Sequence, residues 1–144
     1  TEYSELIDLL DARKALETEA ARLAAQNATD DELQKLLKTV SSHQDTVRRN
    51  EDPTNVALDF HATVAEISHN RFIRSILNML IYEEKRIEGK METLVTRERG
   101  RIYVKEHEQI ADAICRHDVE EAAKLMNDHI STLCLAVGEQ VENM

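Results

Sequence analysis

Six histidines are the residues of this sequence with the clearest chemical potential. Three of them, His61, His107 and His129, each lie on the apolar stripe of a different predicted helix. Residues three and four apart share one face of a helix, so all three side chains should point into the interior. A buried neutral imidazole needs a polar partner. Imidazole is also a common ligand of zinc and nickel. The pattern therefore predicts either three separate core histidines or one shared metal centre.

The other three histidines are predicted to be structural. His43 falls close to an apolar stripe, between Val40 and Val47, which predicts a partly buried residue on a helix face. His69 and His117 flank predicted helix ends, where a positive charge is mildly favourable. Helical phase alone does not separate His43 from the three histidines of the candidate site.

Signatures of catalysis are missing from the sequence. It contains no His-Glu-x-x-His motif, no glycine-rich phosphate loop and no Gly-x-Ser-x-Gly motif. Its one Glu-x-x-His, from Glu66 to His69, is half of what a di-iron bundle needs. We therefore predict no enzyme and no catalytic residues.

Two alternatives stay open at this stage. One is a metal-dependent hydrolase-like enzyme, in which the three histidines hold a metal-bound hydroxide. It would need a general acid or base, and Glu66 lies about 140° around the helix from His61, with no better candidate elsewhere. The other alternative is a helical interaction module whose histidines are only structural.

Composition predicts the fold class before any element is placed. The chain has 144 residues, which suits a single domain over residues 1–144. One proline and three glycines cannot supply the frequent turns of a β-sandwich, so an all-α fold is expected. A net charge of −10 makes the chain a poor binder of polyanions. No apolar run could span a membrane and no signal peptide follows Thr1, so we expect a cytoplasmic protein whose Cys115 and Cys134 are reduced.

Apolar periodicity and capping residues divide the chain into helices. Thr29 and Glu32 form a predicted capping box, Pro53 suits a first helical turn, and Asp118 begins the last helix. The predicted helices cover approximately residues 3–25, 29–49, 53–68, 71–88, 101–116 and 118–140. Residues 89–100 are expected to form a loop or a short helix. The result is an antiparallel bundle of six to seven helices joined by short turns.

Four sequence motifs resemble a known family. The run LDFHATVAEISHN, residues 58–70, resembles the FH-x-x-[apolar]-A-x-x-S-x-N segment of the FCD domain. That domain is the C-terminal, effector-binding part of FadR-subfamily GntR transcriptional regulators. Residues 10–25 are similar to the family's R-x-x-L-E and AA-x-L-AA opening. Residues 106–114 and 122–130 resemble its EH-x-x-I-x-x-AI and A-x-x-x-M-x-x-H-[apolar] motifs. The motifs follow in the family's order across nearly the whole chain.

The resemblance implies a divalent metal, zinc or nickel, in a central cavity. In many members one aspartate and three histidines hold this ion, and the matching histidines are His61, His107 and His129. The family aspartate stands four residues before the first histidine, where this chain has Ala57. Asp59 lies about 200° around the helix from His61 and cannot easily replace it. We therefore expect a weaker three-histidine site, completed by water or by the effector.

The resemblance also implies what the domain senses and what it assembles with. Arg13 matches the family's opening arginine, and its guanidinium is a candidate clamp for a small carboxylate metabolite. An ion pair with Glu17 at i+4 fits the same spacing equally well. The family implies a homodimer and a winged-helix DNA-binding domain ahead of Thr1, through which alone DNA would be contacted. Arg97, Arg99 and Arg101 are expected to face solvent or the dimer partner.

Overall fold

The computed structural model describes residues 2–88 and 97–142, and every element within them is an α-helix. The six helices of this part of the chain are α1 (Glu2–Asn27), α2 (Asp30–Arg48), α3 (Thr54–Ile67), α4 (Arg71–Glu88), α5 (Arg97–Cys115) and α6 (Val119–Glu142). The all-α prediction is confirmed.

Local sequence signals explain where the helices begin and end. Thr29 accepts from the Glu32 amide while the Glu32 side chain accepts from the Thr29 amide, which completes the predicted capping box of α2. Asp118 accepts from the Glu121 amide at the start of α6. The connections after α2, α3 and α5 contain residues with left-handed φ angles, at Asn50 (57°), His69 (63°) and His117 (57°). His69 and His117 thus lie at helix ends, as predicted.

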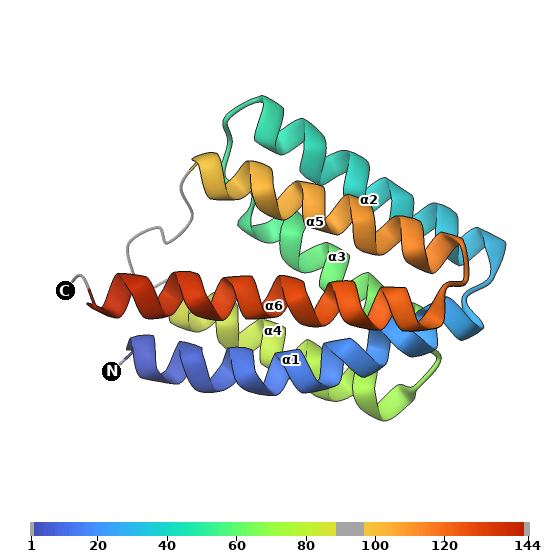
Figure 1. Cartoon of the computed structure of the whole chain (residues 1–144), viewed down its shortest axis with the longest axis horizontal. Coiled ribbons are helices and arrows are strands. Elements are labelled where there is room, and N and C mark those ends of the chain that lie inside the picture. The colour runs from blue at the N-terminus through green and yellow to red at the C-terminus, as the bar shows by residue number, and fades with distance from the viewer. Residues whose placement is uncertain (1, 89–96, 143–144) are drawn as a thin grey trace.

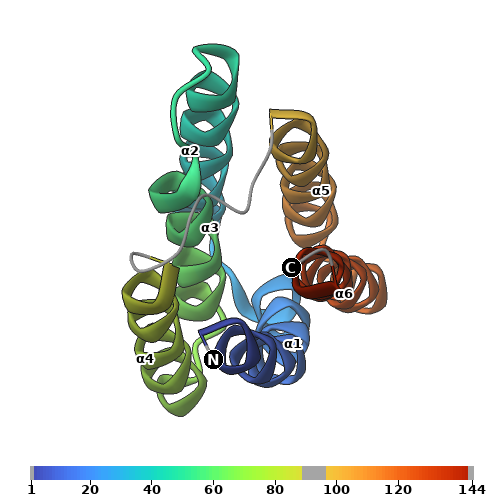
Figure 2. The same ribbon diagram turned by 90° about the vertical axis from the view of Figure 1, so that its left-hand side faces the viewer.

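The helices pack as an antiparallel bundle. Helix α1 runs alongside α6 in the opposite direction, with both termini at the same end of the molecule (Figure 1). In the end-on view, α2, α3 and α4 form one side and α5 and α6 the other, while α1 lies between α4 and α6 (Figure 2). Helix α2 also packs against both α3 and α5, which joins the two sides.

Two apolar clusters fill the interior, with a polar layer between them, and Leu80, Leu133 and Cys134 pack against both clusters. The smaller cluster, at the end that holds the termini, contains Leu6, Leu9, Leu10, Ile87 and Val137. The larger cluster includes the alanines of the second half of α1, from residue 20 onwards. Between these clusters α1 carries two buried charged residues, Arg13 and Glu17, each 1% exposed. The polar layer is therefore built into the core and is not a surface feature.

Two details differ from the pattern in the sequence. Helix α5 begins at Arg97, within the stretch expected to be a loop or short helix; the remainder of that stretch, residues 89–96, lies outside the described residues. Helix α4 is apolar on two faces. It buries Leu77 and Ile81 but leaves Phe72 74% and Met79 55% exposed.

Other predictions concern the thiols and the membrane. Cys115 and Cys134 are both free thiols and are partly buried. Across the part of the chain that the structure describes, no helix is both long enough and apolar enough to cross a membrane.

Candidate metal centre and effector cavity

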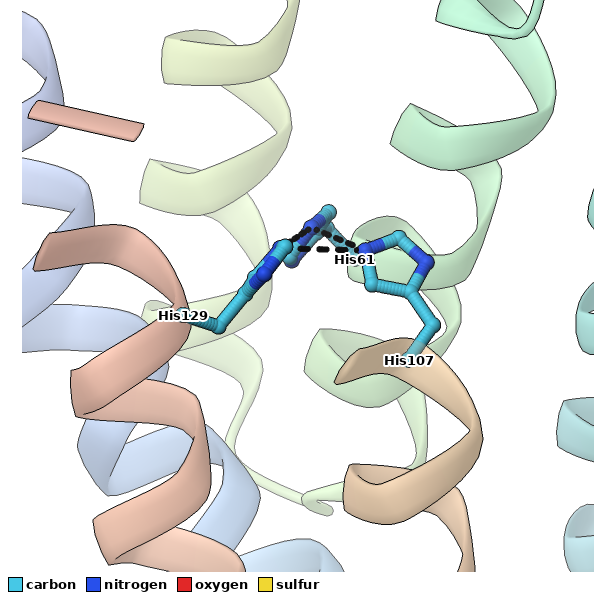
Figure 3. Close-up of side chains that lie close together, drawn as sticks. All are labelled: His61, His107 and His129. Atoms are coloured by element: carbon cyan, nitrogen blue, oxygen red, sulfur yellow. Dashed lines mark hydrogen bonds between the residues drawn. The ribbon is translucent and has the colours of Figure 1, made fainter. Parts of the chain in front are cut away.

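The three predicted metal ligands meet in the polar layer. His61 comes from α3, His107 from α5 and His129 from α6, and all three side chains are buried (Figure 3). The Nε2 atom of His107 lies 3.1 Å from the Nε2 atoms of both His61 and His129. The Nε2 atoms of His61 and His129 are 3.3 Å apart. Three helices far apart in sequence thus bring three imidazole nitrogens to one point.

This triangle of nitrogens has the size that a metal ion requires. With sides of 3.1, 3.1 and 3.3 Å, its centre lies about 1.8 Å from each nitrogen, slightly less than the 2.0–2.1 Å of a zinc–imidazole bond. His61, His107 and His129 would therefore be able to hold one small metal ion together. Without an ion, these contacts are N–H···N hydrogen bonds between the imidazoles, in which one ring donates to another.

Each of the three histidines has a partner for its other ring nitrogen. The Nδ1 atom of His61 bonds to the Glu17 carboxylate, and that of His129 lies 2.8 Å from Glu106 Oε1. The Nδ1 atom of His107 lies 3.1 Å from Nδ1 of His43. Such outer partners fix the tautomer and the ring orientation of metal-binding histidines, which leaves Nε2 free to bind the ion. The outer partners support the interpretation of the cluster as a metal centre.

Burial keeps His61 and His107 in the neutral form that binds metal. The pKa values of His61 and His107 are lowered well below the ordinary range, first by burial and then by neighbouring positive groups. Burial, followed by the influence of His129, lowers the pKa of His43 to about 4, although Glu108 opposes the shift. These three imidazoles are therefore neutral at pH 7.

Arg13 lies beside the histidines and has one unsatisfied nitrogen. Its Nε atom donates to Glu17 Oε2 at 2.6 Å and its Nη1 atom to Glu84 Oε1 at 2.6 Å. Its Nη2 atom is buried and has no hydrogen-bond partner among the described residues. The ion pair with Glu17 is thus present, and two N–H groups remain that a ligand could use. The geometry of Arg13 therefore fits both predictions made for it, the ion pair with Glu17 and the clamp for a carboxylate.

Burial opposes the positive charge of Arg13, and its two carboxylate partners favour it. Burial alone would lower the pKa of Arg13, but the carboxylates of Glu17 and Glu84 together raise it above its ordinary value, so the guanidinium stays charged. Burial raises the pKa of Glu17, and Arg13 opposes this shift. Glu17 thus connects the arginine to His61, because one carboxylate bonds to both.

A cavity of about 70 Å³ adjoins the histidines and the arginine. This is room for a few water molecules or a compact acid. The cavity is lined by Arg13, His43, Pro53, Thr54, Ala57, Leu58, His61, Glu84, Gly100, Tyr103, His107, His129 and Leu133. Ala57, at the position of the family aspartate, thus borders the cavity one helical turn from His61.

Four residues of the site were not predicted for it. His43 was predicted to be a partly buried residue of a helix face, but it is 1% exposed and contacts His107. Glu17 appeared only as a possible partner of Arg13. Glu84 and Glu106 were missed, although Glu106 directly precedes His107 and Glu84 continues the buried line of α4. The available signals were a carboxylate that continues the apolar line of its helix, at Glu84, and one directly beside a candidate ligand, at Glu106.

These features define an all-helical domain with a cavity lined by buried histidines, and comparisons with known proteins identify it further. The family model of the FCD domain matches residues 8–132, so the chain belongs to the FCD domain family. It is 26% identical over 142 residues to the Uxu operon regulator of Haemophilus influenzae, covering 92% of this chain and 53% of that protein. It is 27% identical over 125 residues to the transcriptional repressor NanR of Escherichia coli, covering 84% and 46%.

Solved structures share the fold. A Streptococcus agalactiae GntR protein superposes with a TM-score of 0.80 at 26% identity, over 90% of this chain and 58% of that one. The E. coli protein McbR/YncC gives a TM-score of 0.78 at 16% identity, over 96% and 66%, and shows the same fold. The chain spans about half the length of the curated relatives it matches.

Proposed function

We propose that this FCD domain senses a small carboxylate metabolite as the effector-binding part of a GntR/FadR-type transcriptional regulator. A divalent metal, zinc or nickel, would be held by His61, His107 and His129. One observation carries the proposal: the three histidines whose Nε2 atoms converge and Arg13, whose Nη2 atom has no partner among the described residues, line the same cavity. An acid could place one oxygen on the ion and another on Arg13.

The composition of the site supports both the cation and the acid. Glu17, Glu84 and Glu106 outnumber the single guanidinium of Arg13, and a divalent cation would offset this surplus of acidic groups. Ala57 offers no oxygen, so the ion would keep an open position toward the cavity. The acid thus takes the place that an aspartate fills in the four-ligand pattern.

The relatives support the regulatory role. The two named relatives are an operon regulator and a transcriptional repressor, and each is about twice as long as the region it shares with this chain. We propose that a winged-helix domain outside this chain contacts DNA and that the regulator works in the cytoplasm. The −10 charge of this chain fits a part that does not touch DNA itself.

Metal analysis and thermal denaturation test the sensor proposal together. Purified protein should contain about one zinc or nickel ion per chain, and the melting temperature should rise with added metal and then with a suitable di- or tricarboxylate. His107→Ala should lose the metal because one of three ligands is gone. His69→Ala is the matched control, since that histidine is exposed and bonds to Glu32. If neither metal nor any acid raises the melting temperature, the proposal is wrong.

An exposed apolar stripe on α4 supports a homodimer. Phe72, Ile76, Met79 and Tyr82 recur at helical spacing and are 43–74% exposed. We propose that a second copy of the chain covers this face, as in a two-fold dimer that buries the same patch on both subunits.

Sedimentation analysis tests the dimer interface. Met79→Glu should shift the wild-type dimer to monomer, because it places a charge in the apolar centre of the interface. Leu135→Glu on α6 introduces the same charge at another exposed apolar position, 69% exposed, and should leave the dimer intact. Dimers that survive Met79→Glu would refute this interface.

A further inference from the structure

Glu84 is the point at which α4 reaches the effector cavity. On the buried side of α4, Leu77 and Ile81 are apolar, and Glu84 continues their line with a carboxylate that is 5% exposed. Among the described residues of α4, Glu84 alone lines the cavity. Its one described hydrogen bond is to Nη1 of Arg13. Helix α4 is thus connected to the site through one ion pair.

An acid that binds Arg13 must share the guanidinium with two carboxylates. Glu17 occupies Nε and Glu84 occupies Nη1, and only Nη2 lacks a partner among the described residues. A third carboxylate would bring like charges together in a buried site, where repulsion is much stronger than in water. Repulsion would then favour the displacement of one of the two resident carboxylates.

Glu84 is the carboxylate that can move. Glu17 is held at both oxygens, by Arg13 at one and by His61 at the other, and its side chain is 1% exposed. Glu84 is held at one oxygen, and its side chain is 7% exposed, at the edge of the polar layer. Displacing Glu17 would also disturb a candidate metal ligand, whereas displacing Glu84 would not.

We propose that Glu84 is an internal competitor that occupies Arg13 in the empty site and is displaced by the acid effector. This inference rests on the proposed function, because it needs an acid at Arg13. When Glu84 leaves Arg13, α4 loses its one ion pair with the site, and packing alone then holds that part of the helix. The opposite face of α4 carries the exposed stripe of Phe72, Ile76, Met79 and Tyr82. Occupancy of the cavity is thereby communicated to this surface.

Acetate affinity tests the competition directly. Glu84→Gln keeps the size of the side chain and an acceptor for Arg13 but removes the competing charge. In NMR titrations of zinc-loaded protein, it should bind acetate at least about fivefold more tightly than wild type, the lower end of typical coupling between sites. Glu83→Gln is the matched control. It removes the same charge from the neighbouring residue, which pairs with Arg86 at the surface, and should bind acetate like wild type.

A purely structural role for Glu84 predicts the opposite result. Losing a buried ion pair would then loosen the site, and acetate would bind equally well or more weakly. Either of those outcomes, or acetate that binds none of the three proteins, overturns the proposal. Zinc content measured in parallel tests the metal centre separately. If zinc does not bind, the proposed metal centre is wrong, and the same acetate comparison on the metal-free proteins still tests Glu84.

Hydrogen exchange on wild type provides a test that needs no variant. Acetate should speed amide exchange in α4 while it leaves α2 unchanged, because only α4 loses a contact. Acetate that protects α4 would contradict the displacement of Glu84. This measurement keeps the proposal testable if Glu84→Gln does not fold.

Discussion

Replacing Arg13 with alanine is expected to lower the free energy of unfolding by about 3–5 kcal/mol, the usual cost of removing one partner of a buried ion pair. The reason is that Glu17 and Glu84 would both stay buried with no cation beside them. Urea denaturation of metal-free protein measures the loss. The same variant should not respond to acids, but its low stability makes it a poor probe of binding alone.

Two further variants make the Arg13 result specific. Arg22 also lies on α1 and also bonds to two glutamates, but it is 32% exposed, so Arg22→Ala should cost less than about 1 kcal/mol. Arg13→Lys retains the charge without the planar fork and should recover part of the stability but little of the acid response. Equal losses in Arg13→Ala and Arg22→Ala would show that the buried pairs contribute little.

The second large effect is expected from Ala57→Asp. Ala57 and His61 lie one turn apart on α3 and both line the cavity, so an aspartate would offer the missing fourth ligand. Because changes to outer partners alone alter metal affinity by about 10–100-fold, a new direct ligand should raise zinc affinity by more than about tenfold. Competition with a chromogenic chelator measures this affinity.

The same substitution should separate metal binding from acid binding. In wild type, acetate should strengthen zinc binding, and linkage requires zinc to strengthen acetate binding by the same factor. In Ala57→Asp the new carboxylate occupies the open position, so this mutual effect should disappear. Ala62→Asp is the control: Ala62 is also half-buried on α3 but borders an outer groove, where its carboxylate cannot reach the histidines. Similar zinc affinities in the two variants would contradict a vacant ligand position at residue 57.

Helix positions and the direction of the three histidines could be predicted because they depend on local signals. The capping box at Thr29 needs only residues three apart, and apolar spacing places His61, His107 and His129 on inner faces whatever the fold. Helical phase indicates a face but not a partner. It therefore could not show that Glu106 would bond to His129 on another helix.

Where the sequence was ambiguous, tertiary packing determined which side chains are buried and which partners they contact. Helix α4 has apolar residues on two faces, and only its packing against α1 and α3 determines that Leu77 is buried and Phe72 exposed. His43 resembles an ordinary residue of a helix face until α2 and α5 come together and place it against His107. Glu84 stands at a core position with a charged side chain, which can be interpreted only once Arg13 faces it.

The polar layer between the two apolar clusters has a consequence for the lifetime of the protein in the cell. A domain of 144 residues that buries an arginine, two carboxylates and four histidines gives up hydrophobic contact that would otherwise stabilise it. Any ligand that binds only the folded state restores stability in proportion to the logarithm of its concentration. Proteases remove chains that unfold, so a difference of about 1–2 kcal/mol changes abundance several-fold. The amount of this protein would then follow the supply of its ligand, in addition to any change in its shape.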